Sequence, residues 1–416
     1  MRTHVRRRFT RTVGLHDQLT HLPEPVMTAP ALPIDLYGWF DTLTADENHR
    51  RLAMRTVLER DIAPVADDHW DRGEFYHEAL AGFHALDPLA HYFEGDSSNR
   101  TMIDGLYSLE LARVDPSMAS YYGVHGGLCL GSIMLLGSDA QRDEWLPHLR
   151  AFSRIGCFGL TEPDVGSGVA RGLTTRCRRD GNAWVLNGEK KWIGNATFAD
   201  VVVIWARDED DQTVKGFIVR TTTPGYAARL MKGKISQRAL ASGWITMTDM
   251  RIAESDRLEQ ARGFGDTARV LSAARIGVAF QAVGCAIGAY EHALRYAGQR
   301  EQFGRPIAGF QLVQMMLVRM LGNVTAMLGM ALRAARLQDA GQATDAHTSL
   351  AKQFCAFHCR ETVQLAREMM GGNGVLLEHG AARLFADAEA IYSYEGTNEM
   401  TALVVGRAIT GQSAFV

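Results

Sequence analysis

The pattern of apolar residues changes twice along this chain, at about Gly156 and again at about Phe264. From Thr44 to Leu149 apolar residues recur three and four positions apart, as in residues 101–114, which predicts amphipathic helices. Between the two changes the apolar runs are short and are separated by Gly, Asn and Asp, which predicts strands. After Phe264 the helical spacing returns. The chain is therefore expected to fold as helices, then a sheet, then helices.

The predicted strands occupy residues 184–188, 201–206, 216–219 and 244–247. Parallel neighbours need a crossover of a dozen or more residues, and no helix-length crossover follows any of these runs. We therefore expect an antiparallel barrel or sandwich within an α+β fold. No Gly-x-Gly-x-x-Gly follows a strand, which argues against a dinucleotide-binding unit.

With 416 residues, the chain is long enough for two or three packed units. Gly277, Gly284 and Gly288 lie along one predicted helix and would let a neighbouring helix approach closely. The bundle after the sheet is expected to share its outer faces with other subunits. The expected organisation is an N-terminal extension, partly disordered, over 1–43, a helical domain over 44–155, a β domain over 156–262 and a helix bundle over 263–416.

Composition limits the classes of partner. The net charge of −3 gives no reason to expect nucleic acid or a membrane surface as a partner. No uninterrupted apolar run reaches the ~18 residues of a spanning helix. Six scattered cysteines lack the density of a secreted scaffold, so a reducing cytoplasmic location is expected.

The first 27 residues carry five arginines within the first eleven positions, but no apolar core of a secretory signal follows them. We expect a disordered tail, or a native start at Met27. A transit peptide is the alternative.

Glu395 stands between two aromatic residues and a Gly-Thr pair, in Tyr392-Ser393-Tyr394-Glu395-Gly396-Thr397. An apolar setting makes a carboxylate costly to ionise and raises its pKa, which suits a general base. On these residues alone, a surface Glu in a turn is an equally good interpretation.

Four motifs in a fixed order weigh against that alternative. They are 160–167 (Leu-Thr-Glu-Pro-Asp-Val-Gly-Ser), 300–306 (Arg-Glu-Gln-Phe-Gly-Arg-Pro), 370–374 (Met-Gly-Gly-Asn-Gly) and 394–397 (Tyr-Glu-Gly-Thr). Together they resemble the acyl-CoA dehydrogenase family of FAD enzymes. The tail 406–411 resembles the branch of glutaryl-CoA dehydrogenases and plant short-chain acyl-CoA oxidases. The resemblance covers residues 45 to 416 and implies a helical N-terminal domain, an antiparallel β-barrel and a four-helix bundle.

The resemblance also implies roles for individual residues. Glu395 would remove the α proton of an acyl-CoA thioester, and hydride would leave the β carbon for flavin N5. The implied substrate contacts are Ser167, Arg275, Gly396, Ala119 and Ser120. Some of the flavin contacts would reach the FAD of a neighbouring subunit. The implied FAD contacts are Phe158, Leu160, Thr161, Trp192, Ile193, Gly194, Arg300, Gln302, Phe303, Gln311, Glu368, Gly371, Gly372, Thr397 and Glu399.

The chain departs from the family pattern at three positions. Gly168 replaces the Asp that usually follows Ser167, and Gly194 replaces a Thr whose hydroxyl bonds the flavin. Ala119 stands where glutaryl-CoA dehydrogenases have an Arg that holds the distal carboxylate. Because a buried carboxylate without a cation is costly, we predict that glutaryl-CoA is not the substrate. Tyr121, Tyr122 and His125 favour a short or somewhat polar acyl pocket, with His125 itself a core residue.

The leading hypothesis is thus a short-chain acyl-CoA dehydrogenase of fatty acid metabolism. The resemblance implies an electron-transferring flavoprotein as acceptor and a homotetramer built as a dimer of dimers. One alternative is an acyl-CoA oxidase that passes electrons to O2, which Gly194 favours. The other is a flavin- or acyl-CoA-binding protein without dehydrogenation. Cys355, His358 and Cys359 have helical spacing, but without a second cluster we expect them to pack rather than bind a metal.

Overall fold

The computed structural model describes residues 34–95 and 98–414. Most of the predicted N-terminal extension, residues 1–33, lies outside the described residues. Residues 34–43 contain a short 3-10 helix, η3 (Trp39–Thr42). The first long helix, α1 (Ala45–Asp61), begins at Thr44, whose hydroxyl accepts a hydrogen bond from Glu47 N at 3.2 Å. The Glu47 carboxylate accepts one from Thr44 N in return, so this capping box sets the start of the helix.

The helices before the sheet pack around α4 (Arg100–Val114), most of which is buried. The predicted break after Val114 is confirmed but short, because Asp115 caps the next helix by accepting from Ser117 N. Three consecutive segments then run to Leu136 without a turn, and their middle part is π-helical. The elements around α4 are α2 (Ala66–Arg72), η4 (His77–Ala79), α3 (Ala81–Ala85), η5 (Ala90–Tyr92), α5 (Pro116–Tyr122), η6 (Gly123–Leu130), α6 (Gly131–Leu136) and α7 (Asp139–Arg150).

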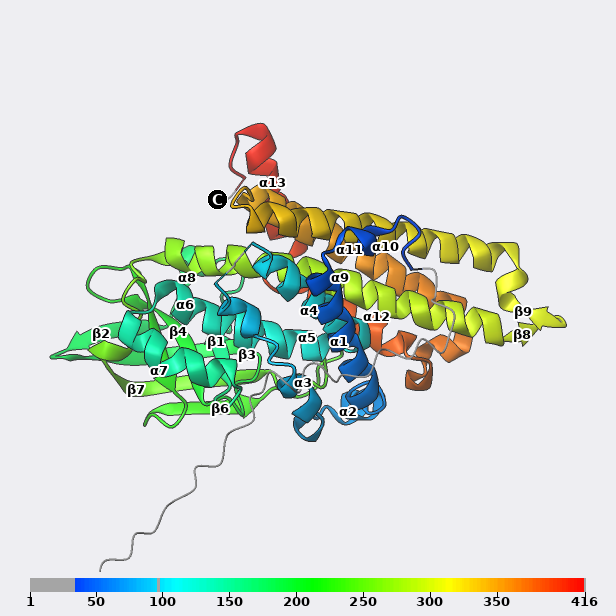
Figure 1. The fold of residues 1–416 in the computed structure, drawn as a ribbon. Coiled ribbons are helices and arrows are strands. Elements are labelled where there is room, and N and C mark those ends of the chain that lie inside the picture. The colour runs from blue at the N-terminus through cyan, green and yellow to red at the C-terminus, as the bar shows by residue number, and fades with distance from the viewer. Residues whose placement is uncertain (1–33, 96–97, 415–416) are drawn as a thin grey trace, which may run out of the picture. The chain divides into compact units, whose positions relative to one another are not determined.

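The predicted β region forms one seven-stranded curled sheet, shown in green in Figure 1. The strands are β1 (Gly156–Gly159), β2 (Arg176–Asp180), β3 (Ala183–Ile193), β4 (Val201–Asp208), β5 (Val214–Arg220), β6 (Tyr226–Leu230) and β7 (Gly243–Ala253). The order is β1-β4-β2-β3-β7-β6, with β5 on the other side of β4. The short segments α8 (Val169–Gly172) and η7 (Glu254–Asp256) lie between and after the strands.

The prediction of a wholly antiparallel sheet is wrong. β4 pairs in parallel with β1, in the register Gly156 to Val201, and in parallel with β2. The other pairs, such as β3 with β7, are antiparallel. The prediction failed because it assumed that a parallel crossover must contain a helix. Here the strands β2 and β3 themselves make the connection from β1 to β4.

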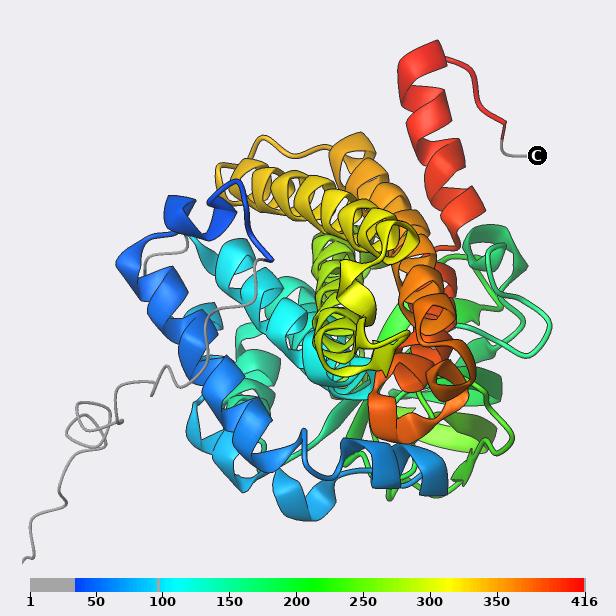
Figure 2. The same cartoon turned by 90° about the vertical axis from the view of Figure 1, so that its right-hand side faces the viewer.

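The C-terminal helices surround α9 (Phe264–Gln299), which contacts α4, α10, α11 and α12. Figure 2 shows α9 in yellow-green at the centre of this ring. Close approach at Gly284 and Gly288 is confirmed, since a Cβ there would lie 2.0 Å from Leu109 O and 2.2 Å from Arg113 O. The remaining elements are β8 (Glu301–Gln302), β9 (Arg305–Pro306), η8 (Ile307–Gly309), α10 (Gln311–Asp339), α11 (Asp345–Met369), η9 (Gly371–Val375), η10 (Leu377–His379), α12 (Ala381–Ser393) and α13 (Asn398–Thr410).

Two helices, α9 and α10, are long and apolar enough to cross a membrane by length and composition alone. Counting uninterrupted apolar residues did not find them, because polar residues such as Gln281 and Glu291 interrupt α9. In the fold, 67% of the apolar window of α9 is buried by the surrounding helices. Core helices pass the same test, so this finding is weak evidence for a membrane protein.

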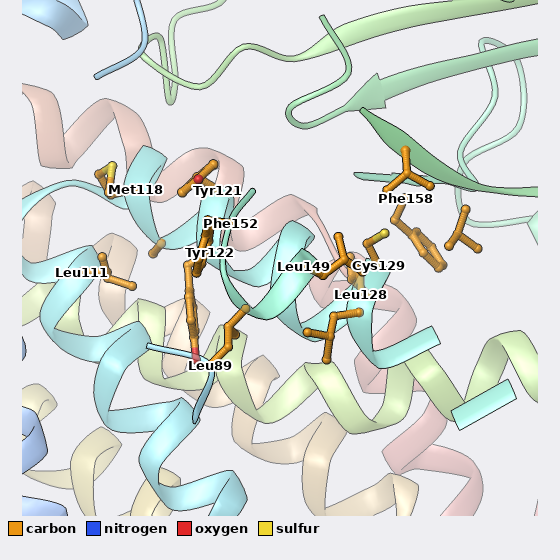
Figure 3. Packing of buried hydrophobic residues seen from close by; sticks show 14 of the residues in the cluster. Leu89, Leu111, Met118, Tyr121, Tyr122, Leu128, Cys129, Leu149, Phe152 and Phe158 are labelled. Atoms are coloured by element: carbon orange, nitrogen blue, oxygen red, sulfur yellow. The ribbon is translucent and has the colours of Figure 1, made fainter. Parts of the chain in front are cut away.

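One apolar cluster joins the first helices to the sheet. It runs from α1 and α4 through η6 and α7 to Phe158 in β1. Figure 3 shows Leu128, Cys129 and Leu149 at this border. A Cβ at Gly156 would lie 2.5 Å from Cys129 Sγ, so β1 and η6 are in direct contact. Through this contact, η6 fixes the position of the first strand relative to the helices.

Candidate functional site

The predicted base lies in a tight turn between α12 and α13. Glu395 has φ 54° and Gly396 has φ 90°, so both lie in the left-handed region. Glycine adopts this conformation without strain, but a residue with a side chain does so at a cost. Such outliers persist where the surroundings hold them, and they cluster at functional sites. We call residues 394–397 the base turn.

The environment of Glu395 favours a proton acceptor that works near neutral pH. Burial raises the pKa of Glu395 to about 7, while the charges of Arg275 and Lys352 oppose this rise. Its Oε2 is buried and has no hydrogen-bond partner among the described residues. Arg275 lies on α9 and donates to Ser349 Oγ at 3.2 Å. The carboxylate is therefore near two cations without a direct hydrogen bond to either.

Tyr394, the residue before the base, ends in a buried polar group. Its hydroxyl donates to Gln281 Oε1 on α9, and the side chains of Ser120 and Gln237 contact the same hydroxyl. Ser120 Oγ donates to Gln237 Oε1 at 2.8 Å. We call Ser120, Gln237, Gln281 and Tyr394 the polar quartet. It joins α5, the loop between β6 and β7, α9 and the base turn, and none of its members carries a formal charge.

The loop that follows β1 contains the predicted flavin contacts Leu160 and Thr161. Thr161 O accepts from Lys191 N at 2.8 Å, which ties the loop to β3. Beneath it, Lys190 Nζ donates to Leu160 O at 3.1 Å and to Glu162 Oε1 at 2.8 Å, and both charged side chains are fully buried. Glu162 also accepts from Thr175 N. This buried ion pair anchors the loop to β3 and to the start of β2.

Trp192, Ile193 and Gly194 lie at the end of β3. A β-bulge between Lys190 and Ile193 shifts the register against β7, and Trp192 has φ 66°. Bulges re-aim side chains at the edges of sites. The indole is consequently 57% exposed, whereas Ile193 is buried. An exposed indole beside the Thr161 loop suits the face of a flavin ring.

Gly194 is placed against the helix η6. A Cβ at this position would lie 3.2 Å from Val124 Cγ2 and 3.6 Å from Leu240 Cδ2. Leu240 belongs to the loop that carries Gln237, a member of the polar quartet. The strand end with the predicted flavin contacts is thus connected to the base turn by one layer of side chains. Phe158, Ala119 and Ser120 are buried around this layer, while Ser167 is exposed on the loop between β1 and α8.

The predicted flavin contacts around Thr161 and Trp192 form a first group. The remaining predicted contacts form a second group at the far end of α9. Arg300 follows the last residue of α9, and Gly371 follows the end of α11. A cleft of about 980 Å³ lies between them, lined by Arg300, Gln302, Phe303, Gln311, Gly371 and Gly372 among others. Glu368 is exposed on the last turn of α11. Figure 1 shows the hairpin β8–β9 at the end of α9 away from the sheet.

One chain does not bring the two groups together. Arg275 and Arg300 are 25 residues apart on or next to α9, which corresponds to roughly 37 Å at 1.5 Å per residue. Phe303, at the tip of the hairpin, is 93% exposed. The second group therefore faces away from the base turn of its own chain.

Both groups fit the parts of an FAD. A Cβ built at Gly371 or Gly372 would meet nothing within 4 Å, so a phosphate has room to approach the backbone there. Arg300 is exposed at the same cleft and can pair with a diphosphate. Trp192 and Thr161 would hold the ring system in the first group. The predicted flavin contacts Thr397 and Glu399 have other partners in this structure: the Thr397 hydroxyl accepts from Met400 N, and Glu399 accepts from the Tyr392 hydroxyl.

His125 is a satisfied core residue, as the sequence predicts. Its Nδ1 accepts from Gly156 N at 2.9 Å, and Nε2 lies 2.9 Å from Leu149 O. Burial lowers the pKa of His125 to about 4, so the ring stays neutral. Cys355 and Cys359 are likewise buried within the helix bundle.

Sequence reasoning missed three residues of the site: Gln237, Gln281 and Lys352. Gln237 and Gln281 are ordinary polar residues in the sequence, and only the fold brings them to Tyr394. Lys352 left a signal, because it falls on the same helical face as Cys355, Ala356 and Cys359. A lysine on a buried apolar face needs a hydrogen-bond partner for its ammonium group.

Family models match almost the whole described chain. They are the N-terminal domain of acyl-CoA dehydrogenase over residues 44–152, its middle domain over 157–250 and its C-terminal domain over 261–410. A 3-(aryl)acrylate reductase of Clostridium sporogenes (strain ATCC 15579) is 31% identical, over 86% of this chain and 96% of that protein. The mitochondrial short-chain specific acyl-CoA dehydrogenase of Rattus norvegicus is 29% identical, over 89% and 92%.

Solved structures agree with these matches. A glutaryl-CoA dehydrogenase from Mycobacterium smegmatis is 38% identical and covers 91% of this chain and 97% of its own, with a TM-score of 0.86. A glutaryl-CoA dehydrogenase from the same organism, in complex with FADH2, is 34% identical, with coverage of 91% and 98% and a TM-score of 0.86.

Proposed function

The chain belongs to the acyl-CoA dehydrogenase family of FAD-dependent oxidoreductases, and from this premise we propose that it converts a short-chain acyl-CoA to the trans-2-enoyl-CoA with Glu395 as base. The observation that carries this proposal is the position of Glu395: a carboxylate in a strained turn, buried, with a pKa of about 7. A base of this pKa can be ionised at neutral pH and still hold a proton that it has taken.

Each proposed step is assigned to a residue of this chain. Glu395 Oε2 takes the α proton of the thioester. The Gly396 N–H donates to the thioester carbonyl and stabilises the negative charge that develops there. Bound FAD supplies the hydride acceptor for the β carbon. Trp192 and the loop at Thr161 would hold its ring system and exclude water from the reacting face.

The acyl group is proposed to be short and without a negative charge at its end. Ala119 is fully buried, and the polar quartet beside it is neutral. Arg383 reaches Asp115 at the start of α5, the helix that carries Ala119, but its guanidinium is already bonded to Asp67, Asp115 and the Val114 carbonyl. Within the described part of the chain, neither Ala119 nor the polar quartet offers a cation to a glutaryl carboxylate, and burying an unpaired carboxylate costs several kcal/mol. The short-chain relative supports the first part of this proposal.

The oxidase is a second candidate for one reason, which is the absence of a hydroxyl at Gly194. We retain electron-transferring flavoprotein as the proposed acceptor on the family resemblance. The exposed Phe303 and the separation of the two cofactor groups support an assembly in which neighbouring copies share each FAD. We propose a homotetramer, a dimer of dimers.

An anaerobic titration of the FAD-loaded protein tests the proposed function. Butyryl-CoA should bleach the flavin, and glutaryl-CoA should not. Admission of air then separates the two candidates, because slow recovery of the yellow colour indicates a dehydrogenase and rapid recovery with peroxide an oxidase. If neither thioester nor any other short acyl-CoA bleaches the flavin, the proposal is wrong and a binding protein remains.

A further inference from the structure

Lys352 is a lysine without solvent exposure whose ammonium group reaches the base turn from the next helix. It lies in the second turn of α11 and donates to Tyr392 O at 2.9 Å and to Gly396 O at 2.8 Å. These two carbonyls stand on either side of Glu395. One ammonium group thereby bridges the end of α12 and the residue after the base.

The base turn requires such a bridge. Glu395 at φ 54° and Gly396 at φ 90° occupy a conformation that the chain leaves unless contacts hold it. The Tyr392 carbonyl belongs to the last turn of α12, where carbonyls have no partner within the helix. Lys352 gives this carbonyl a charged donor and fixes the Gly396 peptide in the same contact. One peptide group before the base, 392–393, and one after it, 396–397, are thus oriented from one atom.

Electrostatic attraction also links Lys352 to Glu395. The groups that face Lys352 are Glu395 in the base turn, Arg275 on α9 and Glu399 on α13. Burial lowers the pKa of Lys352 to about 8, against the opposing charge of Glu395. The ammonium in turn holds the pKa of Glu395 below the value that burial alone would give. Arg275 contributes as well, but it makes no hydrogen bond to the base turn.

We propose that Lys352 is a positioning residue for the base: it holds Glu395 in its left-handed turn and supplies a positive charge that acts on the carboxylate. This inference rests on the proposed function. Lys352 itself does not contact the substrate. Its effect on the reaction passes through the geometry and charge of Glu395.

The test compares two substitutions of Lys352. Lys352→Met keeps the length and apolar stem but removes the donors and the charge, whereas Lys352→Arg keeps both. The readout is the rate of flavin reduction by butyryl-CoA at low substrate, measured anaerobically across pH, which follows the pKa of the base in the free enzyme. In Lys352→Met the midpoint should move upward by about one pH unit, and the rate at neutral pH should fall about fivefold or more. Lys352→Arg should keep the midpoint of the unchanged protein.

Lys234→Met is the matched control. Lys234 is another lysine in a partly buried loop, and it donates to Gln237 O at 2.8 Å and to Leu240 O at 2.6 Å. The carboxylate whose charge acts on Lys234 is Asp387 rather than Glu395. Loss of this lysine should lower stability without moving the midpoint. A midpoint shift that is specific to Lys352→Met therefore reports on the base and not on general damage.

The outcomes separate the two proposals. If the unchanged protein is bleached, Glu395→Gln is not, and Lys352→Met has the midpoint of the unchanged protein, the role of Lys352 is wrong while the proposed function stands. If Lys352→Met does not retain FAD, Lys352→Arg decides: a midpoint moved upward despite the retained charge contradicts the inference. If no acyl-CoA bleaches the unchanged protein, the proposed function fails and this inference fails with it.

Discussion

The hydroxyl of Tyr394 donates a hydrogen bond to the side-chain oxygen of Gln281, so the residue before the base is fastened to the middle of α9. Ser120 and Gln237 complete the contact from two other elements. The base turn is thereby held from one side by neutral polar groups and from the other by Lys352. Its conformation depends on four segments that are distant in the sequence.

Tyr394→Phe should lower stability because it removes the donor and leaves Gln281 Oε1 buried without a partner. We expect a loss of about 1–3 kcal/mol in the free energy of unfolding. Tyr392→Phe is the control, since its hydroxyl bonds Glu399 at an exposed position, and it should change stability by less than about 0.5 kcal/mol. Denaturant unfolding measures both. Equal losses in the two variants would contradict the importance of the polar quartet.

Glu395→Gln should stabilise the protein in a way that depends on pH. The pKa of Glu395 is raised from 4.5 to about 7 in the fold, so the folded state holds the proton more tightly than the unfolded state. The cost of ionising this group is absent below about pH 4.5 and complete above about pH 7, where it amounts to roughly 3 kcal/mol. The amide avoids this cost. Unfolding measured at equal FAD loading should show the variant more stable at about pH 8 and equal at about pH 4.5; a difference independent of pH would be inconsistent with a raised pKa.

Phe303→Ser should weaken both assembly and FAD retention, because this ring is 93% exposed beside the cleft at Arg300. Ile235→Ser, at another exposed apolar position with 73% exposure, is the control. Solution mass and the ratio of FAD to protein after gel filtration are the measurements. We expect the unchanged protein and Ile235→Ser to have the mass of a tetramer, and Phe303→Ser to lose FAD and dissociate. A tetramer that keeps its FAD without Phe303 would refute the shared site.

Gly194→Thr should strain the contact between β3 and η6. A Cβ at this position meets Val124 Cγ2 at 3.2 Å, which is tighter than most such contacts. Overpacking of this kind costs about 1–3 kcal/mol. Val124→Ala makes room, so the double variant should recover part of the loss, and thermal unfolding of the four proteins gives the coupling. Additive effects would mean that the two positions do not touch.

The sequence predicted the order of helices and strands well, because each has its own apolar period. It singled out Glu395 through the four motifs in a fixed order, since the residues around it fit a surface turn equally well, and in the structure this carboxyl group is buried. The pairing of β1 with β4 was not predictable from local pattern, because parallel register depends on how the sheet curls. The prediction of close approach at Gly284 succeeded, as an absent side chain leaves a direct signal on a helix face.

The residues that hold the base turn in place were harder to predict than Glu395 itself. Gln237 is 44 residues from Gln281 and 158 from Glu395 in the sequence, and nothing near it indicates a partner. Lys352 was detectable only as a charge on an apolar helix face. Long-range contacts of this kind become visible when the fold places three helices and one loop around the same turn.

Rapid anaerobic mixing of the FAD-loaded protein with butyryl-CoA, compared with Glu395→Gln, tests the central claim most directly. The variant should keep its FAD and its affinity for the thioester, because the amide has the size of the carboxyl group and Glu395 is not among the proposed FAD contacts. Its flavin should bleach about 10²–10⁴-fold more slowly, since the proton acceptor is gone. A variant that bleaches at the rate of the unchanged protein would show that Glu395 is not the base.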